Sequence, residues 1–145
     1  MLGNIAEFGW HCVHILGENE QPEYSFAIGL FHTYRHPELI VFSLPSTVAH
    51  SILSIAAHEA GRGEPIDINA PTDALLTGYS CCFAEVPPSQ YHENVGFARW
   101  YYQGNDFPLF QIIWPSRSGF FPWHAEASME FRSMQPVLAH SACST

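Results

Sequence analysis

The feature that most constrains the fold is a series of three strand patterns in the first third of the chain. Residues 10–16 and 24–30 alternate with a period of two, which is typical of strands with one buried face. One face of the second pattern consists of small residues, namely Ser25, Ala27 and Gly29. That face predicts the close approach of another backbone or of a ligand. Residues 39–44 form a continuous apolar run between Pro37 and Pro45, which predicts a central strand buried on both faces.

Two later segments have helical spacing. The first has Ser46 or Thr47 as its N-cap and ends at Gly61-Arg62-Gly63. Its apolar stripe consists of Val48, Ile52, Ile55 and Ala56. The second begins at Pro87-Pro88-Ser89 and ends at Gly104. Its stripe consists of Tyr91, Val95, Ala98 and Tyr102.

Two more strands complete the predicted set, at residues 75–86 and 107–114. The resulting order of strands and helices is not a regular βαβ alternation. We therefore predict an α+β fold, with an antiparallel or mixed β-sheet and two main helices packed on it. No linker or repeat divides the sequence, so residues 1–138 are expected to form a single domain and residues 139–145 a frayed C-terminal tail.

The charge balance argues against two classes of partner. Fourteen acidic residues face five basic ones, and the formal net charge is -9. Such a field repels phosphate backbones and anionic lipids, so no nucleic-acid or membrane partner is expected. All the basic residues are Arg, which excludes chemistry that depends on Lys. With only 13% charged and 47% hydrophobic residues, the composition also favours a homo-oligomer.

The compartment is predicted from two patterns. The first residues show no basic region followed by an apolar run, and no stretch reaches the roughly 18 apolar residues that a membrane span requires. The four cysteines show no C-x-x-C spacing, and neighbouring Cys81 and Cys82 would point to opposite faces of a strand. We read the cysteines as thiols of a cytoplasmic protein.

Five short motifs together indicate a family. They are F-x-x-G-L at 26–30, H-P-E-L at 36–39, L-P at 44–45, W-P-x-R-x-G-x-F-P-W at 114–123 and Q-P at 135–136. With these motifs the chain resembles the bacterial domain of unknown function 4262 (DUF4262) over roughly residues 9 to 138. The resemblance implies no established activity, cofactor or catalytic residue. The chain departs from the usual pattern at Ala27, Arg35, Ser116 and His124, where Thr, Gly, Asp and Glu are common.

Two of these motifs carry the candidate site residues. His36 and Glu38 flank Pro37 at the start of a strand, and we predict them as catalytic acid or base groups. Arg117 lies between Trp114 and Trp123, and we predict these three as ligand-binding residues because an Arg held among aromatics can grip a carboxylate or phosphate. The alternative is that Arg117 pairs with Glu38 and has only a structural role. A shared ligand site requires both loops to line one cleft.

Nine histidines raise the question of a metal site. The best set of ligands is His32, His36 and His124, together with Glu38. We predict no metal site, because a turn of unknown shape separates the first pair and His124 departs from the family pattern.

Three functions remain open at this point. The first is binding of a small anionic ligand in an aromatic-walled pocket, with His36 as acid or base and Arg117 as the anion anchor. The second is an acidic protein-interaction or immunity-type module with a basic protein partner, as the net charge suggests. The third is a flavin-binding protein of the split-barrel type, by analogy of element order alone. The sequence assigns no cofactor and leaves open whether the protein is an enzyme.

Overall fold

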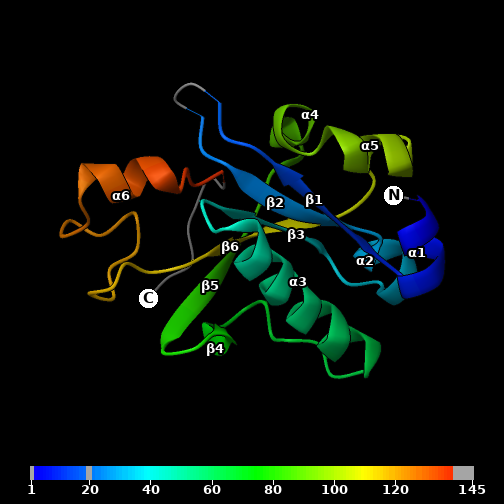
Figure 1. Ribbon diagram of the computed structural model, residues 1–145, viewed down its shortest axis with the longest axis horizontal. Coiled ribbons are helices and arrows are strands. Elements are labelled where there is room, and N and C mark those ends of the chain that lie inside the picture. Colours follow the sequence, from blue (N-terminus) through cyan, green and yellow to red (C-terminus); the bar gives the residue numbers. More distant parts are fainter. Residues whose placement is uncertain (1, 19–20, 139–145) are drawn as a thin grey trace.

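A mixed β-sheet forms the centre of the computed structural model, which describes residues 2–18 and 21–138 (Figure 1). Its strands are β1 (His11–Ile15), β2 (Tyr24–Ile28), β3 (Glu38–Phe42), β4 (Thr72–Leu76), β5 (Tyr79–Glu85) and β6 (Leu109–Ile113). They are ordered β1-β2-β3-β6-β5-β4. Neighbouring strands are antiparallel except for β3 and β6, which are parallel, with Glu38 opposite Leu109. The α+β fold with a mixed sheet is confirmed.

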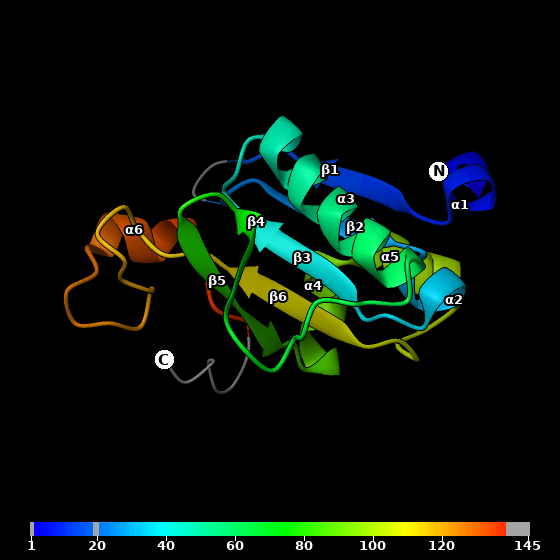
Figure 2. The same ribbon diagram turned by 90° about the horizontal axis from the view of Figure 1, so that it is seen from below.

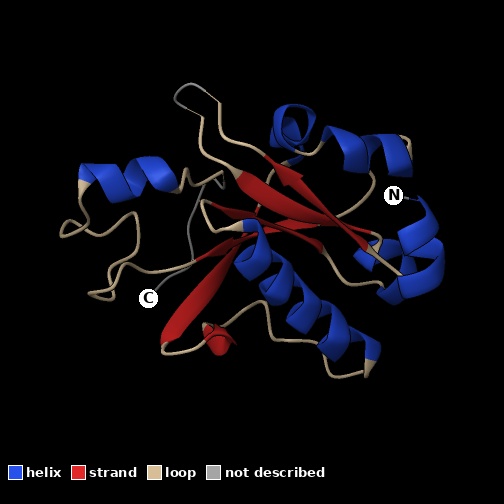
Figure 3. Cartoon of the chain, in the orientation of Figure 1, coloured by secondary structure: helices blue, strands red, loops and turns tan. Residues whose placement is uncertain are grey.

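Helices cover both faces of this sheet (Figures 1 and 3). They are α1 (Leu2–Phe8), α2 (Leu30–Tyr34), α3 (Ser46–Gly61), the 3-10 turn η1 (Pro88–Gln90), α4 (Tyr91–Asn94), α5 (Gly96–Tyr102) and α6 (Met129–Met134). Helix α3 packs on one face, where its Ile52 and Leu53 join Val41 of β3 in the core. The segment η1–α4–α5 packs on the other, where Val95 and Ala98 join Ile40. None of the described helices is long and apolar enough to cross a membrane.

The central strand is the one that the continuous apolar run predicts. All five residues of β3 are buried, because the strand has neighbours on both sides and helices over both faces. The predicted close approach at the small face of β2 occurs at Gly29, directly after the strand. A Cβ atom at Gly29 would lie 2.7 Å from the carbonyl oxygen of Gly9, and its φ of 111° is in the range that favours glycine.

Several local predictions are wrong. Residues 75–86 are not one strand but the end of β4, a turn and β5, because the chain reverses around Gly78, whose φ is positive. The helix predicted from Pro87 to Gly104 is interrupted at Val95, where φ and ψ are -129° and 49°. The N-cap of α3 is Pro45 rather than Ser46 or Thr47.

Two further predictions concern the edges of the domain and of the sheet. The predicted frayed tail, residues 139–145, lies outside the described residues. The flavin alternative rests on a split barrel, but the described strands form an open sheet with β1 and β4 at its two edges. That analogy therefore loses its structural basis.

Candidate functional site

Glu38 is the first residue of β3, and its side chain is fully buried. Its carboxylate accepts backbone N–H groups from the start of α2: Gly29 at 2.8 Å, Leu30 at 3.1 Å and Phe31 at 3.4 Å. It also accepts the hydroxyl of Tyr102, the last residue of α5. Glu38 thus satisfies the free amides of one helix and ties it to another. The predicted catalytic carboxylate is a structural bracket with no exposed surface.

Burial controls the protonation of the Glu38 carboxyl group. Desolvation raises the pKa of Glu38 from its ordinary 4.5 to about 7, although the hydrogen bonds from Tyr102 and from α2 pull the pKa down. Burial and the adjacent Glu38 carboxylate raise the pKa of Tyr102. The Tyr102 hydroxyl therefore stays protonated and donates to Glu38, while it accepts the N–H of His32 at 3.2 Å.

His36 lies two residues before Glu38, and its side chain has a different environment. The residue is 6% exposed, and its Nδ1 donates to the carbonyl of Pro37 at 2.7 Å. This hydrogen bond leaves Nε2 as the basic nitrogen of a neutral ring. Burial lowers the pKa of His36 below its ordinary 6.5, and outweighs the Pro37 hydrogen bond, which raises it. The imidazole is therefore neutral near pH 7.

The Nε2 atom of His36 has no hydrogen-bond partner among the residues that the structure describes. Every fully buried side-chain nitrogen and oxygen in that part of the chain does have one. The Nε2 must therefore touch solvent, although most of the ring is covered. Such an atom can accept a hydrogen bond from a ligand.

A cavity of about 400 Å³ lies beside His36. One wall is the segment 34–37, between α2 and β3, and the other is the end of α3 with the loop that contains Pro65, Ile66 and Ile68. The size falls within the range of about 300–1,000 Å³ that is usual for small-molecule sites. Sequence reasoning singled out His36 but missed the second wall, which has no motif of its own.

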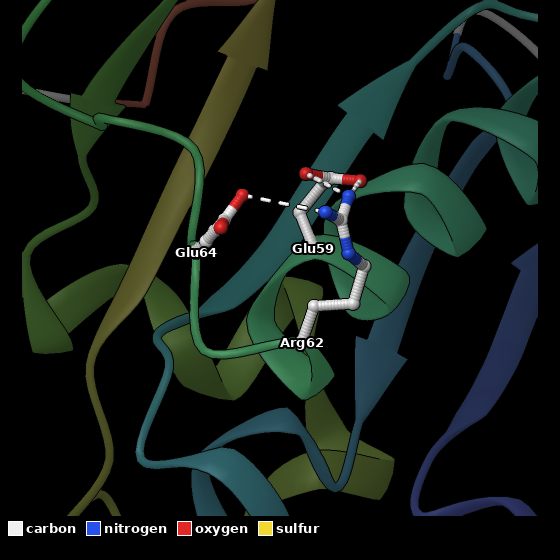
Figure 4. A network of polar contacts seen from close by, with 3 residues as sticks. All are labelled: Glu59, Arg62 and Glu64. Carbon is white, nitrogen blue, oxygen red and sulfur yellow. Dashed lines mark hydrogen bonds and ion pairs between the residues drawn. The ribbon is translucent and has the colours of Figure 1, made fainter.

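The chain enters that second wall through a small ionic network (Figure 4). Arg62 bonds to Glu59 at 3.1 Å and to Glu64 at 3.4 Å, just after the last turn of α3. The Arg62 side chain is 52% exposed, so the network stabilises the fold little. It lies where the chain leaves α3 and enters the loop that lines the cavity.

Arg35 adds a positive charge at this cavity. Its backbone is left-handed, with φ of 58°, a conformation that suits Gly, the residue that the family resemblance led us to expect here. Its guanidinium lies 5.3 Å from the centre of the Phe31 ring, which is a cation–π distance. A non-glycine residue in this conformation costs about 1 kcal/mol or more. The only sequence signal for Arg35 is its departure from the family pattern.

The tryptophans of the other predicted site serve the fold. The indole N–H of Trp114 donates to the carbonyl of Phe42 at 2.9 Å. The backbone N–H and C=O of Trp114 both bond to the side chain of Gln135, at 3.1 and 2.7 Å. Trp123 stacks on Phe121, with ring centres 4.9 Å apart. Gln135 of the Q-P motif is fully buried, and its motif gave no sign of this structural role.

The two predicted loops do not line one cleft. Strands β3 and β6 are parallel (Figure 2). His36 therefore precedes the start of this strand pair, and Arg117 follows its end. Arg117 is exposed and has no hydrogen bond or ion pair within residues 2–18 and 21–138. The expectation of a shared pocket is therefore wrong, and so is the alternative that Arg117 pairs with Glu38.

The histidines do not gather into a metal centre in the described part of the chain. His124 lies beyond the end of β6, where its Nδ1 accepts the N–H of Phe121 at 2.9 Å. His32 belongs to α2, at the opposite end of the sheet.

A hydrogen-bonded Ser–His–Glu series crosses β1 and β2. His14 Nε2 donates to Glu23 at 3.0 Å, so its Nδ1 accepts the hydroxyl of Ser25 at 2.6 Å. The order resembles that of a hydrolase nucleophile with its base. Ser25 is fully buried, however, so an acyl substrate cannot reach its oxygen. The series joins two strands and is not a catalytic site.

Sequence comparison agrees with the motifs. The model of a family described as a domain of unknown function (DUF4262) matches residues 4–128. The chain belongs to the DUF4262 family. No curated protein and no solved structure matches it. In this DUF4262 chain, H-P-E-L builds the bracket and one wall of the cavity at the start of β3. After β6, Gln135 of the Q-P motif bonds to Trp114 of W-P-x-R-x-G-x-F-P-W, and we call this contact, with the Gln111 bonds to residues 136 and 138, the clasp.

Proposed function

We propose that the protein binds a small carboxylic acid in the cavity beside His36. The observation that carries the proposal is the neutral, nearly buried imidazole whose Nε2 lacks a partner among the described residues at the wall of a cavity. A ligand hydroxyl or amide N–H donates to this nitrogen, and the ligand carboxylate pairs with Arg35. Arg35 takes the anchoring role that the sequence suggested for Arg117.

The remaining lining sets the size and charge of the ligand. Pro37, Pro65, Ile66 and Ile68 offer apolar contact for a short carbon skeleton. Asp67 also lines the cavity, and its carboxylate already accepts the N–H of Asn69 at 2.9 Å. Its negative charge disfavours ligands with two or three carboxylates. The preferred ligand is therefore a monocarboxylate with one neutral hydrogen-bond donor.

The proposal concerns binding and not catalysis. A neutral His can act as a general base, but this needs a reacting group and a second catalytic residue. Glu38 cannot take that part, because its carboxylate is enclosed by α2 and Tyr102. Its contribution is to hold α2, and with it residues 34–37, in place.

Calorimetric titration with mandelate, lactate and hippurate tests the proposal, with mandelamide as the uncharged control. We expect saturable binding of at least one acid, no binding of mandelamide, and weaker binding as the pH falls and His36 becomes protonated. His36→Gln and Arg35→Gly should each weaken binding about tenfold or more.

The Arg35→Gly variant separates binding from folding. Glycine suits a φ of 58°, so the variant should fold at least as readily as the wild type while it loses the anion anchor. Gln103→Gly is the matched control, because Gln103 also has a positive φ, of 57°, and does not line this cavity. Equal binding by wild type and Arg35→Gly, or no binding of any of the three acids, refutes the proposal.

A further inference from the structure

A second cavity, of about 590 Å³, lies between the β1–β2 hairpin and helices α4 and α5. It has no residue in common with the His36 cavity. We propose that it binds a flat aromatic cation, such as an N-alkylated nitrogen heterocycle. This inference goes beyond the proposed function, because it concerns another site and a ligand of opposite charge.

The walls of this cavity are aromatic. Phe97 and Trp100 lie three residues apart on α5, on one face of the helix, and are 53% and 60% exposed. Tyr24 of β2 faces the same cavity. Rings on two different elements can enclose a planar ligand from both sides. Large aromatic residues left open to solvent at a cavity are typical of binding sites.

The tyrosine ring is held in place before any ligand arrives. Its hydroxyl donates to the carbonyl of Asn94 at 2.8 Å, and its ring packs 5.1 Å from the ring of Phe42. The contact with Asn94 also ties the end of α4 to the sheet. A fixed ring loses little conformational entropy when a ligand stacks on it.

The break between α4 and α5 lies at the wall of the cavity, where Asn94 and Gly96 line it on either side of Val95. Val95, at the break, is fully buried and anchors the segment on the sheet. The next residue, Gly96, lines the cavity, and a Cβ atom there would meet nothing within 4 Å.

The charge at the cavity favours a cation. Among the described residues that line it, Glu93 is the only acidic one and none is Lys or Arg, while the neighbouring His92 is also ionisable. The net charge of -9 acts in the same direction. Aromatic faces attract cations through their quadrupoles, and most strongly where the cation has lost its water. A flat cation can therefore stack on the rings while its charge faces Glu93.

The test compares three bicyclic probes of similar size and different charge: 1-methylquinolinium, neutral naphthalene and anionic 2-naphthoate. Binding is followed by ligand-observed NMR and by quenching of tryptophan fluorescence. We expect saturable binding of 1-methylquinolinium and at least tenfold weaker binding of 2-naphthoate. Trp100→Ala should abolish binding of the cation, and Glu93→Gln should weaken it about threefold to tenfold.

The controls are exposed residues away from the cavity, Met129→Ala for Trp100 and Glu130→Gln for Glu93. Neither should change the affinity. Equal binding of all three probes, or full binding by Trp100→Ala, overturns the proposal. So does a wild-type dimer, measured by light scattering, that Trp100→Ala converts to a monomer, because the aromatic face would then be an interface between two copies.

Discussion

Strands β3 and β6 run in the same direction (Figure 2). Buried polar side chains have different roles at the two ends of this pair. Just after β6, Gln135 satisfies both backbone groups of Trp114. Gln111, in the middle of β6, likewise bonds to the carbonyl of Pro136 at 2.8 Å and to the N–H of Leu138 at 2.9 Å. At the start of β3, Glu38 is equally enclosed, but His36 keeps one nitrogen without a partner in the described residues, beside a cavity.

The difference distinguishes a clasp from a site. Gln111 and Gln135 are fully buried and each bonds through both its nitrogen and its oxygen, so no ligand reaches them and they fasten the segment 135–138 along β6. A group with unused hydrogen-bonding capacity at a cavity is what ligand recognition needs. The motif richest in aromatic residues and Pro is therefore the structural one, and the shorter H-P-E motif frames the candidate site.

Removal of the clasp should produce the largest loss of stability. Gln135→Ala leaves the N–H and C=O of Trp114 without their partners and opens a space in a fully buried position. We expect the free energy of unfolding to fall by about 3–4 kcal/mol, measured by urea titration. The exposed Gln21→Ala is the control. A loss of less than about 1 kcal/mol would mean that the amide does not hold the segment.

Loss of the Glu38 bracket at the start of β3 should cause the next largest loss of stability. Glu38→Gln places an amide NH₂ where backbone N–H groups and the Tyr102 hydroxyl donate. We expect a loss of about 2 kcal/mol near pH 7. The exposed Glu130→Gln should change the stability by no more than about 0.5 kcal/mol. If Glu38→Gln were as stable as the wild type, the two ends of the sheet would not both depend on a buried polar residue.

The pH dependence of stability distinguishes the two ends, because an acid is buried at only one of them. The folded state holds the Glu38 proton up to a pKa of about 7, whereas the unfolded state releases it near 4.5. The folded state therefore binds more protons between these values, and stability falls as pH rises through that window. The free energy of unfolding of the wild type, minus that of Glu38→Gln, should drop by about 2 kcal/mol from pH 5 to 7.

This subtraction removes the contribution of His36, which is present in both proteins. The lowered pKa of His36 has the opposite sign, because the unfolded state binds more protons as pH approaches 6.5 from below. A flat difference between the two proteins would show that Glu38 is ionised at the same pH in the folded and unfolded chains.

Arg117 should show the smallest effect. It is exposed and makes no ion pair among the described residues, so Arg117→Ala should change the free energy of unfolding by no more than about 0.5 kcal/mol. It should also leave acid binding at the His36 cavity unchanged. A thermal-shift series on wild type and variant checks both points, and a clear loss of ligand response would return Arg117 to the site.

The sequence was sufficient to predict the elements whose apolar residues follow a clear pattern. The apolar run of β3 is buried as predicted, since burial on both faces leaves a direct mark on residue order. Helix α3 is also found, and Ile52 and Ala56 of its predicted stripe are buried, whereas Val48 and Ile55 are only partly buried. Short elements leave no such mark. Helix α6, capped by the Ser128 side chain, was missed, and the break at Val95 interrupted a stripe whose Tyr91, Val95 and Ala98 are nevertheless buried as predicted.

The sequence by itself determined the fold class, the central strand and the candidacy of His36 and Glu38. The tertiary structure decided which candidates meet. Strands β3 and β6 pair in parallel. The motif at the start of β3 and the motif after the end of β6 are therefore separated by the length of these strands. No local pattern encodes that choice, because register and direction depend on how distant strands bury their shared apolar faces.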